Sequence, residues 1–300
     1  MFPYPTIAGF YLKIRRLEGL AAAIDAMNLH RYYTGVILKT ASRIREDKMK
    51  RLSLMATIVA VGLTNSAGAA EITLVAPGGI RAAVEQMIPA FEKKTGHKVK
   101  ATFGSGNGTK AQVTKGEAFD VPIVQPPYPA VLASGNVVNS TETPLAHVAV
   151  GVAVRPGTPH PDISSAEAVK KLFLSAKSIS YPDPAGGAAA GVSMNETLKK
   201  LGITEEMKPK IKLAQGGAGA MKMLADKQVD VGLTFVSEII TEPGVEVVGP
   251  LPESISTPTR LSGFIGAKAK DPKAAKELLD YLSSADAAKV YKERGMVPGK

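Results

Sequence analysis

The chain has no cysteine and no tryptophan, and only 4 of its 300 residues are histidine. Without cysteine, it can form neither a disulfide framework nor a thiolate zinc site. His97, His147 and His160 are scattered, and no two of them share the i, i+4 spacing of a metal pair on a helix. We therefore expect no metal site and no cofactor.

An even distribution of positive charge is also missing. Residues 1–69 contain 10 of the 37 Lys and Arg residues but only 4 of the 27 Asp and Glu residues. The rest of the chain therefore has a net charge of only +4, against +10 for the whole. Aromatic residues make up 5% of the chain, and no basic stripe is interleaved with them. We expect no nucleic-acid partner.

Residues 49–69 have the order of a secretory signal peptide. Lys50 and Arg51 follow Met49, residues 52–63 are mostly apolar, and small residues occupy 67–69. The apolar run is shorter than the roughly 20 residues that a membrane-spanning helix needs. The pattern predicts export to the periplasm with removal of 49–69. Because signal peptides begin at the N-terminus, we interpret residues 1–48 as a start-site misassignment or a disordered extension.

Residues 70–300 alternate between strand and helix patterns. Val84, Met87, Ile88 and Phe91, for example, recur at the three- and four-residue spacing of an amphipathic helix. Strands are predicted, with helices between most of them, at 72–76, 98–103, 121–124, 147–154, 178–181, 211–214, 229–235, 245–248 and 261–267. Alternating strands and helices are typical of parallel βαβ units, so we predict an α/β fold built from two such units.

Four loops rich in small residues, at 77–79, 104–108, 183–191 and 216–219, are each predicted to follow a strand and precede a helix. α/β sheets bind ligands beyond the carboxyl ends of their strands. Free N–H groups at a helix start attract anions, and glycine lets the backbone approach them closely. One such loop alone is more often a tight turn than a site. Four together predict an anion-binding cleft.

Some nearby side chains have two interpretations. Arg81 is either a bidentate clamp for a carboxylate or a solvated helix residue. Glu238 is either a base facing the cleft or a solvated loop carboxylate, and Tyr181 is either a proton donor at the cleft edge or a packed core residue. The sequence has no Gly-x-Ser-x-Gly elbow, so hydrolase chemistry of that kind is not indicated.

Five segments, 72–84, 90–96, 103–106, 183–191 and 288–295, resemble the periplasmic molybdate-binding proteins in sequence and in order. The resemblance extends over nearly all of 71–300. It implies a type II periplasmic-binding-protein fold with a ligand cleft between two lobes, which we expect at 70–150 plus 252–300 and at 151–251. It also implies a monomer that delivers its ligand to an ABC permease in the inner membrane.

The resemblance also implies where the ligand binds. The family's two oxyanion-binding serines fall at Gly79 and Gly106, its backbone donors at Ala190 and Gly217, and its tyrosine at Phe235. This chain therefore lacks two hydroxyl donors and one phenol donor of that family. Their loss predicts a roomier pocket and a larger organic anion, such as a di- or tricarboxylate. The candidate ligand-binding residues are Gly79, Ile80, Arg81, Ser105, Gly106, Asn107, Ala190, Gly191, Gly217 and Phe235.

Two functions remain open. The first is a receptor of an ABC importer that captures a small anion. The second is a periplasmic isomerase, because aconitate isomerase is similar to the same family. Its 1,3-proton shift needs a base, which Glu238 or Tyr181 would supply. No motif demands catalysis, so we expect a receptor rather than an enzyme.

Overall fold

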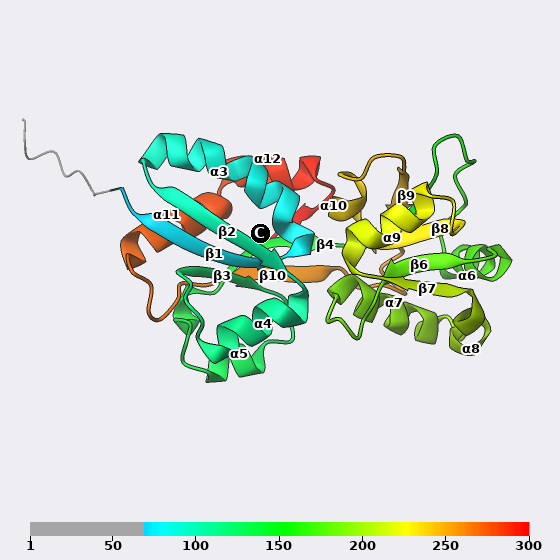
Figure 1. The fold of residues 1–300 in the computed structure, drawn as a ribbon, viewed down its shortest axis with the longest axis horizontal. Coiled ribbons are helices and arrows are strands. Elements are labelled where there is room, and N and C mark those ends of the chain that lie inside the picture. The colour runs from blue at the N-terminus through cyan, green and yellow to red at the C-terminus, as the bar shows by residue number, and fades with distance from the viewer. Residues whose placement is uncertain (1–68, 300) are drawn as a thin grey trace, which may run out of the picture. The chain divides into compact units, whose positions relative to one another are not determined.

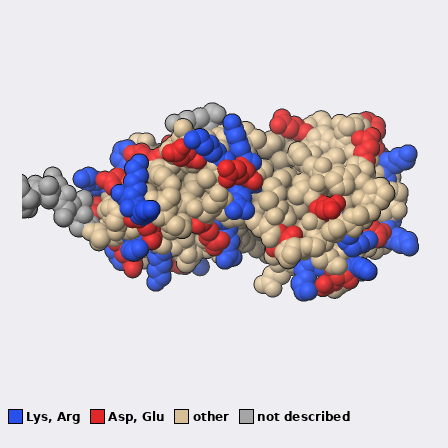
Figure 2. Space-filling view, turned by 90° about the horizontal axis from the view of Figure 1, so that it is seen from above, with Lys and Arg blue, Asp and Glu red and all other residues tan. Residues whose placement is uncertain are grey.

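The computed structural model describes residues 69–299. The extension predicted at 1–48 and the signal peptide predicted at 49–69 lie outside the described residues, apart from residue 69. Across residues 69–299, no helix combines the length and the apolar character needed to cross a membrane. Acidic and basic side chains are intermixed on the face shown in Figure 2, without a stripe of one sign.

The described chain forms two mixed β-sheets, each with helices packed on it (Figure 1). Lobe 1 contains the six-stranded sheet, in the order β11-β4-β10-β3-β1-β2, and lobe 2 the five-stranded sheet, in the order β7-β6-β8-β5-β9. The lobe 1 strands are β1 (Glu71–Pro77), β2 (Lys98–Gly104), β3 (Val121–Val124), β4 (Thr143–Val148), β10 (Thr259–Gly263) and β11 (Val297–Pro298). The lobe 2 strands are β5 (Val150–Val154), β6 (Ile179–Pro182), β7 (Ile211–Ala214), β8 (Val231–Phe235) and β9 (Glu246–Pro250). The predicted two-lobed α/β fold is confirmed.

The central strand pairs are parallel, as βαβ units require. β1 pairs in parallel with β2 and β3, and β6 pairs in parallel with β7 and β8. The antiparallel pairs join β10 to β3 and β4, β11 to β4, and β5 to β8 and β9. Because parallel neighbours end at the same sheet edge, the segments that follow β1 and β2 lie together, as do those that follow β6 and β7.

Helices cover both faces of each sheet (Figure 1). In lobe 1, α3, α11 and α12 lie on one face and α4 and α5 on the other, whereas in lobe 2, α9 lies opposite α7 and α8. The helix bounds are α3 (Arg81–Thr95), α4 (Gly106–Lys115), α5 (Pro129–Ala133), α6 (Ala166–Ser175), α7 (Ala189–Lys200), α8 (Thr204–Met207), α9 (Gly216–Ala225), α10 (Val236–Ile239), α11 (Pro272–Leu282) and α12 (Ala285–Glu293). Short 3-10 turns occupy Gly78–Ile80, Asn139–Thr141 and Lys208–Lys210.

Helix α3 shows how the sequence pattern produces this packing. Ala83, Val84, Met87 and Phe91 form its buried stripe against the lobe 1 sheet. Fully burying one large apolar side chain stabilises the fold by about 1.5–3 kcal/mol. The helix ends at Gly96, whose φ of 79° is the left-handed conformation that glycine adopts without strain.

The single strand predicted at 147–154 is wrong. The structure divides it at Ala149 into the end of β4 in lobe 1 and the whole of β5 in lobe 2. Val148 and Val150, on either side of this residue, are both buried, so the apolar pattern continues unbroken across the boundary. Ala149 therefore marks one of the two places where the chain crosses between lobes. The other is the segment 251–258, between β9 and β10.

Two of the predicted loops are in fact largely helix. Gly106 and Gly108 belong to the first turn of α4, and Gly216 and Gly217 to the first turn of α9. Glycine has a low helix propensity, so the sequence pattern placed both starts too late. Ser105 caps α4 by accepting a hydrogen bond from the Gly108 N–H at 3.1 Å. Both helices thus begin directly at the sheet edge.

Candidate functional site

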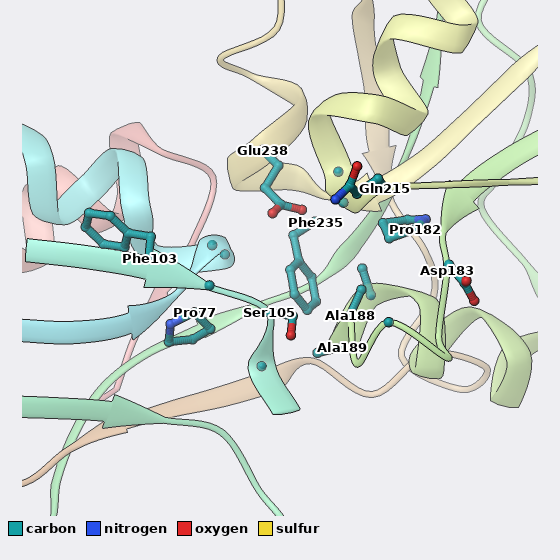
Figure 3. A pocket seen from close by; sticks show the side chains of 18 of the residues that line it. Pro77, Phe103, Ser105, Pro182, Asp183, Ala188, Ala189, Gln215, Phe235 and Glu238 are labelled. Atoms are coloured by element: carbon teal, nitrogen blue, oxygen red, sulfur yellow. The ribbon is translucent and has the colours of Figure 1, made fainter. Parts of the chain in front are cut away.

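A cavity of about 630 Å³ lies between the sheet edges of the two lobes. Lobe 1 contributes residues from 77–81 and 103–106 and the side chain of Gln125, and lobe 2 contributes residues from 182–190 and 213–217 with Phe235 and Glu238. All four glycine- and alanine-rich segments singled out in the sequence therefore line one shared cavity, part of which Figure 3 shows.

The cavity wall contains the starts of four helices. α4 begins at Gly106, α7 at Ala189 and α9 at Gly216, and α3 follows the 3-10 turn at Gly78–Ile80. The first four N–H groups of a helix have no partner within the helix, and they give this end roughly half a positive charge. Two of these helices come from each lobe, so a bound anion would be held from both sides.

Arg81 is at the cavity edge and is already paired. Its Nε lies 2.9 Å from Glu85 Oε1, one turn further along α3, and its guanidinium stacks over the Phe103 ring at 5.5 Å. The Arg81 side chain is 61% exposed. It lines the cavity, but an anion would have to compete with Glu85 for it.

Glu238 points its carboxyl group into the cavity from α10 (Figure 3). Its Oε2 accepts a hydrogen bond from the Thr234 hydroxyl. Burial raises the pKa of the Glu238 carboxyl, while the hydrogen bonds from Thr234 and from the Phe235 backbone lower it and Glu242 raises it further. The net shift is upward, so Glu238 holds a proton more readily than an ordinary glutamate.

The space expected at Gly79 and Gly106 is filled. A Cβ at Gly79 would lie only 2.9 Å from a ring carbon of Phe235, and a Cβ at Gly106 would overlap the amide of Gln125. The prediction of a roomier pocket at these two positions is therefore wrong. The missing side chains are replaced by groups from distant parts of the sequence, and the cavity owes its volume to other positions.

Gln125 is the main site residue that the sequence analysis missed. It directly follows β3 and lines the cavity, although only 4% of it is exposed. No side-chain hydrogen bond of Gln125 occurs among the described residues, and its amide is not a buried group without a partner, so the amide end is accessible from the cavity. Its position after a strand beside β1 was the available signal, but the prolines that follow indicated only a turn.

The candidate residues separate into two groups. Those that line the cavity are Gly79, Arg81, Ser105, Gly106, Ala190, Gly217, Phe235 and Glu238, and those that do not are Ile80, Asn107, Gly191 and Tyr181. The Tyr181 hydroxyl instead donates to Asn195 Oδ1 on α7 at 2.9 Å, and burial raises its pKa to about 12. Tyr181 thus has the packing role that the sequence left open. Asp183 and Gln215 also line the cavity.

The family model of bacterial extracellular solute-binding proteins matches residues 72–297. The chain belongs to this family. Aconitate isomerase from a Pseudomonas species is 30% identical over 235 residues, which cover 76% of this chain and 87% of that protein. The molybdate-binding protein ModA of Azotobacter vinelandii is 31% identical over 255 residues, which cover 81% and 97%. The resemblance to molybdate-binding proteins is confirmed.

Solved structures share the fold of this solute-binding protein. The periplasmic molybdate-binding protein of Azotobacter vinelandii superimposes with a TM-score of 0.64 at 19% identity, covering 76% of this chain and all of that one. PEB3 with bound L-phospholactate superimposes with a TM-score of 0.58 at 19% identity, covering 75% of this chain and 99% of that one. At these identities the likeness shows the fold alone.

Two hydrogen bonds join the lobes of this solute-binding protein beside the cavity. The Asn107 N–H donates to the Gly187 carbonyl at 3.1 Å, and the buried Ser237 hydroxyl donates to the Gly79 carbonyl at 2.7 Å. The first bond uses one of the free N–H groups at the start of α4, which explains why Asn107 faces the other lobe rather than the cavity.

Ser237→Ala is expected to lower the free energy of unfolding by about 1–3 kcal/mol, because it leaves the buried Gly79 carbonyl without this donor. Thermal or urea unfolding measures the change. Thr241→Ala removes a hydroxyl that bonds to a carbonyl at an exposed helix end, so it should stay within about 0.5 kcal/mol of the parent protein. Equal effects of the two substitutions would contradict a special role for the Ser237 bond.

Proposed function

We propose that this protein captures a small organic anion bearing two or three carboxylates in the periplasm and delivers it to an ABC permease of the inner membrane. The observation that supports this most is the cavity of about 630 Å³ at the starts of four helices. Sites for small organic ligands commonly have volumes of about 300–1,000 Å³. One tetrahedral oxyanion would leave most of this space unfilled.

The energetics suit such a ligand. A hydrogen bond to a charged group contributes about 1.5–3 kcal/mol, so five of them reach the roughly −8 kcal/mol of micromolar binding even after desolvation. Donors are available from both lobes: the Gly106 N–H, the N–H groups at the start of α9 around Gly217, and the amide of Gln125. A ligand with carboxylates at its two ends would contact both lobes at once and favour their closure.

The names of the similar proteins include two classes of ligand, organic acids and an inorganic oxyanion. Aconitate isomerase is named for a tricarboxylate, and PEB3 was solved with L-phospholactate, whereas the ModA proteins are named for molybdate. The filled positions at Gly79 and Gly106 favour the organic class, because the hydroxyls that would hold a compact oxyanion there are replaced by Phe235 and Gln125.

Isothermal titration calorimetry of the exported protein with trans-aconitate, citrate, molybdate and sulfate tests the proposal. We expect a dissociation constant in the micromolar range for at least one tricarboxylate. Molybdate should bind at least about tenfold more weakly, because it cannot span the donors of both lobes. Tight binding of molybdate with no response to either tricarboxylate would overturn the proposal.

Glu238 favours one alternative, an isomerase that moves a proton within a tricarboxylate. Its carboxyl group lies in the cavity and its pKa is raised, which makes its carboxylate a stronger base than that of an ordinary glutamate. Incubation with trans-aconitate, followed by NMR for the cis isomer, distinguishes the two functions. A receptor shows no conversion, whereas an isomerase shows conversion that falls by about a hundredfold or more in Glu238→Gln.

A further inference from the structure

Two carboxyl side chains, Asp183 and Glu238, line a cavity whose main chain is arranged to receive an anion. Asp183 has a local role, since its Oδ1 accepts a hydrogen bond from the Ala185 N–H at 2.9 Å. Glu238 is different. Its Oε2 accepts a hydrogen bond from the Thr234 hydroxyl, the Phe235 backbone N–H also donates to the carboxyl group, and the carboxyl group points into the cavity (Figure 3).

Both lobes leave room for this carboxyl group. A Cβ at Gly78 in lobe 1 would lie 3.2 Å from Glu238 Oε1, and a Cβ at Gly217 in lobe 2 would overlap Oε2. The absence of side chains at these two positions places the carboxyl group between the starts of α3 and α9. A bound anion held by those helix starts would therefore lie next to Glu238.

Within residues 69–299, no positively charged side chain forms an ion pair with Glu238. Arg81 lines the cavity but pairs with Glu85, while Glu242 is a like charge that raises the pKa of Glu238. On the elements packed against α10, Lys222 of α9 pairs with Asp226, and Glu246 of β9 pairs with His160. An ionised Glu238 would repel an arriving anion, whereas its protonated form would offer a donor.

We propose that Glu238 binds the ligand in its protonated form and donates a hydrogen bond from Oε1 to a ligand carboxylate oxygen, so that capture of the anion requires one proton on the protein. This role rests on the proposed function, because it needs a carboxylate ligand in this cavity. It makes Glu238 the residue that selects ligands with an acceptor oxygen at this point. It also makes affinity depend on pH.

The sign of that dependence follows from linkage. The protonated form dominates below the pKa of Glu238 in the unliganded protein, and this pKa is raised. Affinity is therefore greatest on the acidic side and decreases as pH rises through that pKa, approaching about tenfold per pH unit above it. The carboxylates of trans-aconitate stay ionised between pH 6 and 8, so they do not contribute to the change.

Calorimetry with trans-aconitate from pH 6 to 8 tests the proposal on the full protein and three variants. At the acidic end of this range, where the protonated fraction of Glu238 is highest, we expect the parent protein and Glu238→Gln to bind within about threefold of each other, because the glutamine amide also donates. Glu238→Ala should bind at least about tenfold more weakly. As pH rises, only the proteins that keep Glu238 can lose affinity. Glu242→Gln is the third variant: it removes the like charge that raises the pKa of Glu238, so it should keep the loss of affinity with rising pH but move that loss to lower pH.

Each result has one meaning. If Glu238→Gln binds more than tenfold more weakly than the parent at the acidic end of the range, the carboxylate itself is needed, and the proposal that Glu238 acts in its protonated form is overturned. Equal affinities of the parent and Glu238→Ala for the ligand would show that Glu238 does not contact it, and would overturn the proposal. If the parent binds neither trans-aconitate nor citrate at any pH, the proposed function fails, and the role of Glu238 fails with it. Circular dichroism of each variant establishes that it is folded.

Discussion

Replacing Gly191 by alanine should destabilise the protein by about 3 kcal/mol, the upper end of the usual cost of overpacking. Gly191 is in the first turn of α7, where this turn packs against the end of β6. A Cβ there would overlap the Pro182 carbonyl and lie 2.9 Å from the Pro184 nitrogen. Both neighbours are backbone atoms, so no side-chain rotation relieves the clash. The start of α7 would have to move away from the sheet.

Urea unfolding of Gly191→Ala measures this loss, and Gly186→Ala is its control in the same loop. The nearest atom to a Cβ at Gly186 is the Asp183 carbonyl at 3.5 Å, an ordinary contact. We expect that variant to stay within about 0.5 kcal/mol of the parent. Similar stability for the two variants would show that α7 does not approach β6 as closely as described.

Replacing Gln125 by methionine should weaken tricarboxylate binding by about ten- to a hundredfold, the equivalent of one hydrogen bond to a charged group. Methionine keeps the length of the side chain beside Gly106, so the wall of the cavity stays filled while the donor is lost. Because no hydrogen bond to the Gln125 amide is present in the described part of the chain, folding should lose little. Calorimetry with trans-aconitate, or with the tightest-binding tricarboxylate of the panel, gives the change in affinity.

Gln215→Met provides the comparison for Gln125. Gln215 also lines the cavity, but it is exposed, so water already satisfies its amide and a ligand gains less from it. We expect a change in affinity of less than about threefold. Equal losses at the two positions would mean that burial does not distinguish the two amides, and an unchanged affinity in Gln125→Met would remove Gln125 from the site.

The sequence predicted the strands well wherever a short apolar run was bounded by turn residues. β3 and β7 occupy the predicted ranges 121–124 and 211–214 without change. Where an apolar run stays buried across the junction of two strands, no turn residue indicates the junction. The change from β4 to β5 at Ala149 was therefore missed. The starts of α4 and α9 were placed late because glycines in a first helical turn contradict intrinsic propensity, and only the tertiary structure overrides it.

The site was predictable where it consists of main chain and not where it depends on distant side chains. Glycine-rich segments at strand ends follow from the sequence and the geometry of parallel sheets. The packing of Phe235 on Gly79 and of Gln125 on Gly106 does not, because it joins residues far apart in the chain. The role of Tyr181 was not predictable for the same reason. Its hydroxyl bonds to Asn195 on α7, a helix that the sequence alone does not place beside β6.

The wall of the cavity consists largely of peptide groups, and this limits how ligand specificity can change. Peptide N–H groups are the same in every amino acid except proline, so the attraction for negative charge at the starts of α4, α7 and α9 comes from the backbone and does not identify the anion. Under the proposed function, discrimination among anions falls to a few side chains that line the cavity, chiefly Gln125, Phe235 and Glu238. Under the same proposal, substitutions at these three positions would change which anion is bound without altering the backbone donors.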